Sequence, residues 1–223
     1  VKKGFTSFGT LPSGNVPTGM WNFTVDTGTG SIVVTDGTNF YYTTNGSSYT
    51  TIRTGLDNTA VSDCEMVYND LWCTNGSNDV WRWPGPPSTG VVMAIGPDVP
   101  TGEYIEFEKG IVWIGRTSTG RSSVFFSNRT NSTDGGIIVP SSGSAWPAIN
   151  ELRVSQNDGD AIRGMKKYLG SVALCKDNSI YMLEGENEFN FKFERVLHNI
   201  GCNNNTMVED NGLLYLAGSR GIY

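Results

Sequence analysis

Residues 161–185 read AIRGMKKYLGSVALCKDNSIYMLEG, and this stretch decides the fold. It contains three strand-length runs separated by short turns, one around Gly170 and one at Asp177–Asn178. Gly, Asn and Asp are the residues that tight turns between antiparallel strands favour. No apolar period of 3.6 residues, the mark of an amphipathic helix, is sustained in it. The stretch therefore predicts a small antiparallel sheet.

The same order of strand, turn, apolar strand, turn and aromatic-bearing strand recurs along the chain. Four further segments follow it, at residues 30–52, 64–83, 103–127 and 206–223. The strands after the first turn are anchored by Phe40, Leu71, Ile111, Val172 and Leu213, at spacings of 31, 40, 61 and 41 residues. Apart from the spacing of 61, these values approach the roughly 40-residue repeat of four-stranded propeller blades.

A sheet of this size has two apolar faces that it cannot cover alone, and radial stacking of such sheets buries both. The continuous apolar runs IVWIG (residues 111–115) and LLYLAG (residues 213–218) predict middle strands buried on both faces. Alternation in the run DVWRW places Trp81 and Trp83 on one face and Arg82 on the other. We predict an all-β β-propeller of about five recognisable blades, each with three to four antiparallel strands. A β-sandwich is the alternative, but it does not explain the repeated spacing.

The predicted domain organisation follows from these repeats. Blades are expected at about residues 30–57, 61–87, 103–130, 161–197 and 201–223. Residues 1–29 are expected to form a partial strand or a linker, and residues 131–160 a loop-rich insertion that accounts for the long spacing. Because the chain starts without Met and ends within a strand-like run, we expect it to be part of a longer protein.

Charge and composition disfavour two classes of partner. The 223 residues carry a formal net charge of −6, and no run of Lys and Arg exceeds two residues. Phosphate backbones require clustered cations, so sequence-specific nucleic-acid binding is not expected. No apolar run approaches the roughly 18 residues that a membrane-spanning helix needs, so membrane insertion is not expected either.

The cysteines point away from a metal site. Cys64, Cys73, Cys175 and Cys202 include no C-x-x-C pair, and His198 is the single histidine, so a structural zinc site is disfavoured. Cys64 and Cys73 flank a turn and can face each other across a hairpin. We favour buried free thiols over a disulfide, because Cys packs well as a small apolar residue.

Residues 103–223 carry a family resemblance. The pattern consists of five features in a fixed order: VFFS (Val124–Ser127), Trp146, DGDAIRG (Asp158–Gly164), SIYMLEG (Ser179–Gly185) and GC…GIY (from Gly201 onward). In this pattern the chain resembles the propeller-type structural proteins of tailed bacteriophages, found in tail nozzles and at head–tail junctions. The first hundred residues match only the general order of strands and turns.

The resemblance implies a non-enzymatic component of the virion that acts in assembly. Its partners would be other copies of itself and neighbouring tail proteins, and the family brings no catalytic, cofactor-binding or metal-binding residues. The acidic turn at residues 157–160 (NDGD) is then expected to redirect the chain into a new blade. A calcium loop is disfavoured there because the ligand order and the closing Glu of an EF-hand are missing.

Three groups of residues suggest enzymatic alternatives, and none is favoured. The stretch TTNGSSY (Thr43–Tyr49) is similar to the Asp-box hairpin of sialidases, with Asn45 in place of Asp, but such hairpins are structural. Glu106 and Glu108 share one face of a predicted strand, as paired glycosidase carboxylates would, but a solvated rim is the favoured interpretation. His198 has no G-x-S-x-G nucleophile to serve.

The alternative function is a propeller that binds or cleaves glycans for host recognition. Trp81 and Trp83, followed by PGPP, are the candidates for an aromatic platform that stacks on a sugar ring. The competing interpretation is that both rings pack between blades. Three convergent arginines, or two facing carboxylates, would favour the glycosidase.

Overall fold

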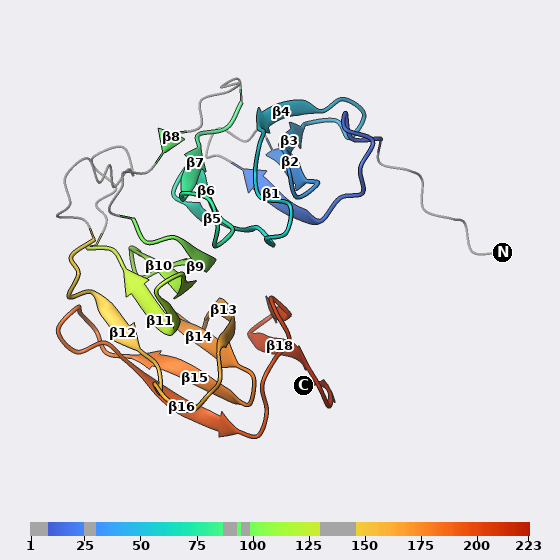
Figure 1. Ribbon diagram of the computed structural model, residues 1–223. Helices are drawn as coiled ribbons and strands as arrows, with labels where there is room; N and C mark the ends of the chain where they lie inside the picture. The colour runs from blue at the N-terminus through green and yellow to red at the C-terminus, as the bar shows by residue number, and fades with distance from the viewer. Residues whose placement is uncertain (1–8, 25–29, 87–92, 95–98, 130–145) are drawn as a thin grey trace.

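The protein folds as a β-propeller-type arrangement of five antiparallel sheets around a common centre, as Figure 1 shows for the computed structural model. The structure describes residues 9–24, 30–86, 93–94, 99–129 and 146–223. The predicted all-β fold and the five blades are confirmed. In this described part, no helix has the length and apolar character that crossing a membrane requires.

Each sheet is built from strands that are consecutive in the chain. The first contains β1 (Gly19–Thr24), β2 (Gly30–Thr35), β3 (Phe40–Thr43) and β4 (Thr50–Arg53). The second contains β5 (Asp63–Val67), β6 (Asp70–Thr74), β7 (Trp81–Trp83) and β8 (Met93–Ala94). The third contains β9 (Gly102–Glu108), β10 (Ile111–Thr117), β11 (Gly120–Phe126) and β12 (Glu151–Arg153). The fourth contains β13 (Ile162–Tyr168), β14 (Ser171–Lys176), β15 (Ser179–Glu184) and β16 (Lys192–His198). The fifth contains β17 (Met207–Asp210), β18 (Leu213–Gly218) and β19 (Gly221–Ile222).

The first strands of neighbouring sheets lie next to one another. Strand β9 contacts both β5 and β13, and β13 contacts β17. These strands therefore surround the centre of the arrangement, while the last strands lie farther out (Figure 1). A charged residue on β5, β9 or β13 that faces a neighbouring inner strand can therefore contact residues of another blade.

Apolar cores fill the spaces between the blades. The second strand of the third sheet is buried on both faces over Ile111–Ile114, as predicted. Val112 and Ile114 pack with Trp72 of the second sheet, and Trp113 packs in the cluster shared with the fourth sheet. One face of β10 therefore packs on the second sheet and its other face packs on the fourth. The third sheet is buried between its two neighbours in this way, as the repeated sequence pattern predicts.

The fifth sheet departs from the predicted burial. Leu214 and Leu216 face the fourth sheet, and Leu216 is buried. On the opposite face, Leu213 is 57% and Tyr215 is 42% exposed. The prediction that LLYLAG is buried on both faces is therefore wrong for this strand, because none of the described residues covers its outer face as the next blade covers the other sheets.

Three edge strands fall outside the predicted boundaries. Strand β1 belongs to the segment 1–29 and completes the first sheet, and β8 lies beyond residue 87. Strand β12 lies within the expected insertion and pairs with β11. Strand β12 has only three residues and none of them is buried. Its sequence, ELR, is therefore too short and too polar to show the alternation that indicates a strand. Residues 130–145 lie outside the described part.

The cysteines form two disulfides, which corrects the expected free thiols. Cys64 and Cys73 are direct partners in the β5–β6 hairpin, with Cα atoms 4.2 Å apart, so the pairing register brings their side chains together. Cys175 on β14 is joined to Cys202, with Cα atoms 6.0 Å apart, and this disulfide ties the loop before β17 to the fourth sheet. All four cysteines are buried, as expected.

The outer faces of the first and the fifth sheet differ. In the first sheet, Leu11 packs against Val34 and Tyr41 and covers this face. The segment that carries Leu11 is tied down by the Thr18 amide, which donates a hydrogen bond to the Thr35 carbonyl oxygen at 2.7 Å. The first sheet is thus partly covered by its own chain, although Met20, the register partner of Val34, is 67% exposed there. Among the described residues, no such segment lies over the fifth sheet.

Candidate functional site

The proposed tryptophan platform is not formed. Trp81 is 2% and Trp83 is 0% exposed, and both lie in the apolar core between the first and second sheets. Phe40 packs edge-on against Trp81, and Phe23 packs against Trp83 at 4.8 Å between ring centroids. Arg82 lies on the other face and forms an ion pair with Asp70 at 2.7 Å. Neither ring face can stack on a sugar in this arrangement, so these residues serve the packing of two blades.

The Asp-box-like stretch is a hairpin between β3 and β4. Asn45 Oδ1 accepts hydrogen bonds from the amides of Ser47 and Ser48, at 2.9 and 3.0 Å. Thr43 Oγ1 accepts one from the Gly46 amide at 2.9 Å. These bonds stabilise a tight turn, as the structural interpretation of this stretch predicted.

The acidic turn at residues 157–160 binds a cation that belongs to the chain itself. Asn157 and Gly159 have positive φ, and the turn leads from β12 into β13 as predicted. The fully buried ammonium of Lys176 lies 2.7 Å from Asp158 Oδ1. It also donates to the carbonyl oxygens of Val154 and Ser155. The place that a metal would take in such a loop is occupied by a lysine.

The carboxylates of β9 do not form a solvated rim. Glu106 is completely buried, and its Oε1 lies 2.7 Å from Lys166 Nζ of β13. The Lys167 amide donates to Glu106 Oε2 at 3.2 Å, and Lys167 Nζ reaches Glu65 Oε1 of β5 at 2.6 Å. The predicted rim is therefore wrong for Glu106, because β9 is an inner strand between two others. Glu108 is partly buried at the turn into β10.

Asp63, Glu65, Glu106, Lys166 and Lys167 form an ionic cluster, in which burial is the largest influence on the pKa values of Asp63 and Glu106. It raises the pKa of Glu106 to about 8 against the opposing attraction of Lys166. It raises the pKa of Asp63 to about 6, although Asp63 accepts a hydrogen bond from the Ile105 amide. Burial would lower the pKa of Lys166, but the neighbouring carboxylates outweigh it and raise that pKa. Each carboxylate of β5 and β9 in the cluster has a partner within the fold, so the cluster joins three blades.

His198 does not lie in a cluster of chemically active groups. It is exposed at the end of β16, opposite Ser179. Among the residues that the structure describes, no group of three or more His, Cys, Asp or Glu side chains is placed to hold a metal ion.

A polar cavity of about 300 Å³ is a concave site that the sequence did not indicate. It is lined by residues from the loop 57–61, the turn 75–77, the inner strand β9, the bulge in β10 and the loop 204–205. These segments come from the second, third and fifth blades and from the connection between the first two. The lining residues are Asp57, Thr59, Ala60, Val61, Asn75, Gly76, Ser77, Glu103, Tyr104, Arg116, Asn204 and Asn205. They are up to 148 positions apart in sequence, so no local motif could reveal the site.

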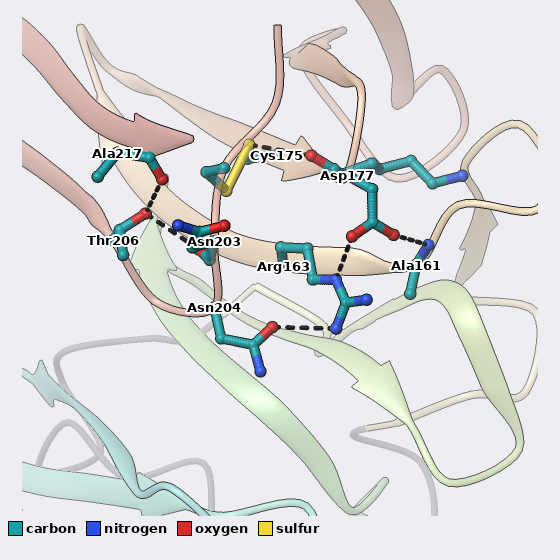
Figure 2. The surroundings of a disulfide bond; sticks show 10 residues. Ala161, Arg163, Cys175, Asp177, Asn203, Asn204, Thr206 and Ala217 are labelled. Atoms are coloured by element: carbon teal, nitrogen blue, oxygen red, sulfur yellow. Dashed lines mark hydrogen bonds and ion pairs between the residues drawn. A yellow bond between two sulfur atoms is a disulfide. The ribbon is translucent and has the colours of Figure 1, made fainter. Parts of the chain in front are cut away.

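The loop that brings Asn204 and Asn205 to this cavity is firmly anchored, as Figure 2 shows. The Cys175–Cys202 disulfide holds its start, and Thr206 Oγ1 donates to the Ala217 carbonyl oxygen at 2.8 Å. Gly201 allows this route, because an added Cβ would collide with the Asp177 carbonyl oxygen.

Arg163 fixes the orientation of the Asn204 side chain. Its Nε lies 2.6 Å from Asp177 Oδ1, and its Nη1 donates to Asn204 Oδ1 at 3.1 Å. The hydrogen bond and the charge of Asp177 raise the pKa of Arg163. With its oxygen held in this way, Asn204 turns its amide nitrogen away from Arg163 (Figure 2).

One wall of the cavity contains the buried phenol of Tyr104 beside the ion pair of Arg116 and Glu103. Arg116 has a φ of 53° at a bulge in the β10–β11 pairing, and its Nη1 forms an ion pair with Glu103 Oε2 at 3.0 Å. Tyr104 is 3% exposed, and its hydroxyl lies in the field of Arg116. Within the described residues, no hydrogen bond of good geometry reaches the Tyr104 hydroxyl, although the Arg116 guanidinium lies close enough to act on its pKa. Burial and the charge of Glu103 raise the pKa of Tyr104 to about 12, so it stays a neutral phenol.

Sequence comparison does not place the chain in a family. No family model matches it, and no curated protein matches it in sequence.

Comparison with solved structures shows the fold. YCF48 bound to D1 peptide is 12% identical, with a TM-score of 0.58, and the match covers 87% of this chain and 59% of that one. Virginiamycin B lyase from Staphylococcus aureus is 14% identical, with a TM-score of 0.55, over 92% of this chain and 69% of the lyase.

The extracellular domain of the putative one component system BT4673 from B. thetaiotaomicron is 15% identical, with a TM-score of 0.54, over 86% of this chain and 25% of that one. The chain thus spans about three fifths of the YCF48 structure. These neighbours include a lyase and a peptide-bound protein, so they share an architecture rather than an activity. The chain has the fold of a β-propeller.

Proposed function

We propose that the chain is a non-enzymatic structural component of a bacteriophage virion. It would be a β-propeller domain of a tail nozzle or head–tail connector protein, acting in assembly through protein–protein contacts. The motifs of residues 103–223 support the assignment to a virion. The propeller fold supports a structural role, because each blade is held by its neighbours and the domain is therefore stiff. YCF48, which shares this fold, was solved with a bound peptide, so propellers of this kind accept polypeptide partners.

The observation that carries the assembly role is the outer face of the fifth sheet. Val208 and Tyr215 are register partners on this face, and they are 57% and 42% exposed. Leu213 adds a further apolar side chain that is 57% exposed. Exposed apolar patches of this kind mark interaction sites when they lie on an ordered element. We call Val208, Leu213, Tyr215 and Ile222 the outer patch.

The complement of the outer patch is an apolar face of a β-sheet, and in an assembled tail a neighbouring tail protein would supply it wherever no further sheet of the same protein does. The four preceding sheets each bury the equivalent side of their second strand against the next sheet. The fifth sheet offers the same chemistry, namely aliphatic and aromatic side chains on a pleated surface. A flat apolar sheet face is therefore the complement that these side chains fit best.

Site-specific photo-crosslinking in assembled particles tests this proposal. A photoreactive amino acid at Leu213 is expected to form adducts with a neighbouring tail protein. The same probe at Phe189, which is 91% exposed on the β15–β16 loop, is the matched control and should form few. Mass spectrometry of purified particles would identify the adducts. Absence of the chain from virions, or equal crosslinking at both positions, would contradict the proposal.

A further inference from the structure

The polar cavity between the second, third and fifth blades has the construction of a ligand site. Its volume of about 300 Å³ lies at the lower end of the range for small-molecule sites, roughly 300–1,000 Å³. Its wall is assembled from loops of separate blades, and each loop is fixed independently. The Cys175–Cys202 disulfide fixes one side, and hydrogen bonds from Ser77 and Thr59 to Asp57 fix the opposite side, at 2.7 Å each.

Hydrogen-bonding groups of both kinds face this cavity. Asn204 contributes an amide nitrogen whose direction is set by Arg163, and Arg116 contributes guanidinium donors. Glu103 and Asp57 contribute carboxylate acceptors. A hydroxyl group can donate and accept at once. A ligand hydroxyl beside the Glu103–Arg116 ion pair would therefore donate to the carboxylate and accept from the guanidinium.

The charge of the wall opposes ionic ligands. Glu103 is paired with Arg116, and Arg163 is paired with Asp177 beside the cavity. Hydrogen bonds from Ser77 and Thr59 lower the pKa of Asp57, which keeps its carboxylate ionised. An anion would meet two carboxylates and a cation would meet a guanidinium. An apolar ligand would leave the polar wall without hydrogen-bond partners.

We propose that this cavity binds a small uncharged polyhydroxylated ligand, namely a single saccharide unit. The site is separate from the outer patch and does not depend on the role in assembly. It also differs from the tryptophan platform, since neither Trp81 nor Trp83 lines it. The bulge at Arg116 positions the guanidinium in the wall, which is a recurrent use of β-bulges near binding sites.

Titration of the purified chain with D-glucose, D-galactose and N-acetyl-D-glucosamine tests the proposal. Saturation-transfer NMR and calorimetry are expected to show saturable binding of at least one sugar. Inorganic phosphate and a tetraalkylammonium salt serve as the anionic and cationic probes and should not compete. Failure of all three sugars to bind, or displacement of a bound sugar by phosphate, would overturn the proposal.

Arg116→Gly is the decisive variant, because Gly adopts a φ of 53° without strain while the guanidinium is removed. Loss of a charged donor should weaken sugar binding at least about tenfold. Lys109→Gly is the matched control, since Lys109 is also a cation at positive φ (57°), in the β9–β10 turn and outside the cavity. It should bind the sugar like the unmodified chain.

Two further variants separate ligand binding from folding and from assembly. Tyr104→Phe removes the phenol hydroxyl beside Arg116 and should weaken binding by roughly fivefold to tenfold, and its melting temperature checks that the variant still folds. Leu213→Glu changes the outer patch and should leave sugar affinity unchanged. Full sugar affinity in both Arg116→Gly and Tyr104→Phe would place binding elsewhere and overturn the proposal.

Discussion

Lys166 places its ammonium 2.7 Å from the carboxylate of Glu106, across the boundary between the third and fourth blades. The Glu106 side chain is 1% exposed and that of Lys166 is 28% exposed, so the carboxylate depends on this lysine for its charge partner. At about pH 9, where Glu106 is ionised in the folded chain, Lys166→Met should lower the free energy of unfolding by about 3 kcal/mol, because a buried carboxylate is left without its cation. Urea denaturation measures this change.

The Glu106→Gln, Lys166→Met double variant is the control for this pair. With both charges removed, stability should recover to within about 1 kcal/mol of the unmodified chain. A double variant as unstable as Lys166→Met alone would show that packing, and not the unpaired charge, explains the loss.

The same ionic cluster predicts how stability depends on pH. Burial raises the pKa of Asp63 to about 6 and of Glu106 to about 8, whereas both groups titrate near pH 4 in an unfolded chain. The folded protein therefore holds more protons than the unfolded chain between about pH 4 and pH 8. The stability that these groups contribute is complete below the unfolded pKa and is lost as the pH rises through 6 and 8.

We therefore expect the free energy of unfolding to fall by a few kcal/mol between about pH 5 and about pH 9. Urea denaturation across this range measures the trend. The Asp63→Asn, Glu106→Gln double variant should flatten it, because neither amide titrates. A stability that rises over this range would contradict the raised pKa values.

The two disulfides should contribute unequally to stability. Cys64 and Cys73 are 9 positions apart, whereas Cys175 and Cys202 are 27 positions apart. Closing the longer loop removes more entropy from the unfolded chain, by about 1 kcal/mol for this threefold difference. Replacing Cys175 and Cys202 by Ala should therefore destabilise more than replacing Cys64 and Cys73.

Calorimetry of the two double variants gives this comparison, and hydrogen exchange adds a local measurement. Amides of the loop 203–206 should lose protection when Cys175 and Cys202 are replaced. Equal losses of stability in both variants would show that native contacts, and not loop closure, decide the contribution of each disulfide.

Leu174 and Leu213 make a matched pair for comparing a buried with an exposed leucine. Leu174 is fully buried in the core between the third and fourth sheets, and Leu213 is 57% exposed in the outer patch. Leu174→Ala should cost about 2–5 kcal/mol of unfolding free energy. Leu213→Ala should cost less than about 0.5 kcal/mol, as surface substitutions do. A large loss on Leu213→Ala would mean that the outer patch is already covered.

The sequence predicted those parts of the fold that depend on local pattern. Turn residues and apolar runs identified the sheets, and the spacing across residues 68–70 placed Cys64 opposite Cys73. Strand β12 was missed because ELR, a three-residue edge strand, carries no apolar alternation. The burial of Glu106 was missed because alternation assigns a face to a side chain but does not show what lies against that face.

The cavity could not be predicted for a related reason. Arg116 and Asn204 are 88 positions apart and meet only because the blades surround a common centre. In the sequence, Asn204 belongs to a polar run that predicts a loop and nothing more. The positive φ of Arg116 arises from a register shift between β10 and β11, which the run IVWIGRT does not reveal.

The two end sheets of the arrangement, the first and the fifth, differ in how far their outer faces are covered. Leu11 covers part of the flank formed by the first sheet, while the described residues leave the apolar flank of the fifth sheet exposed. A further β-layer, from the same protein or from a partner, would therefore find more apolar surface at the fifth sheet than at the first. The eight residues from Leu11 to Thr18, which fold back on the first sheet, create this asymmetry.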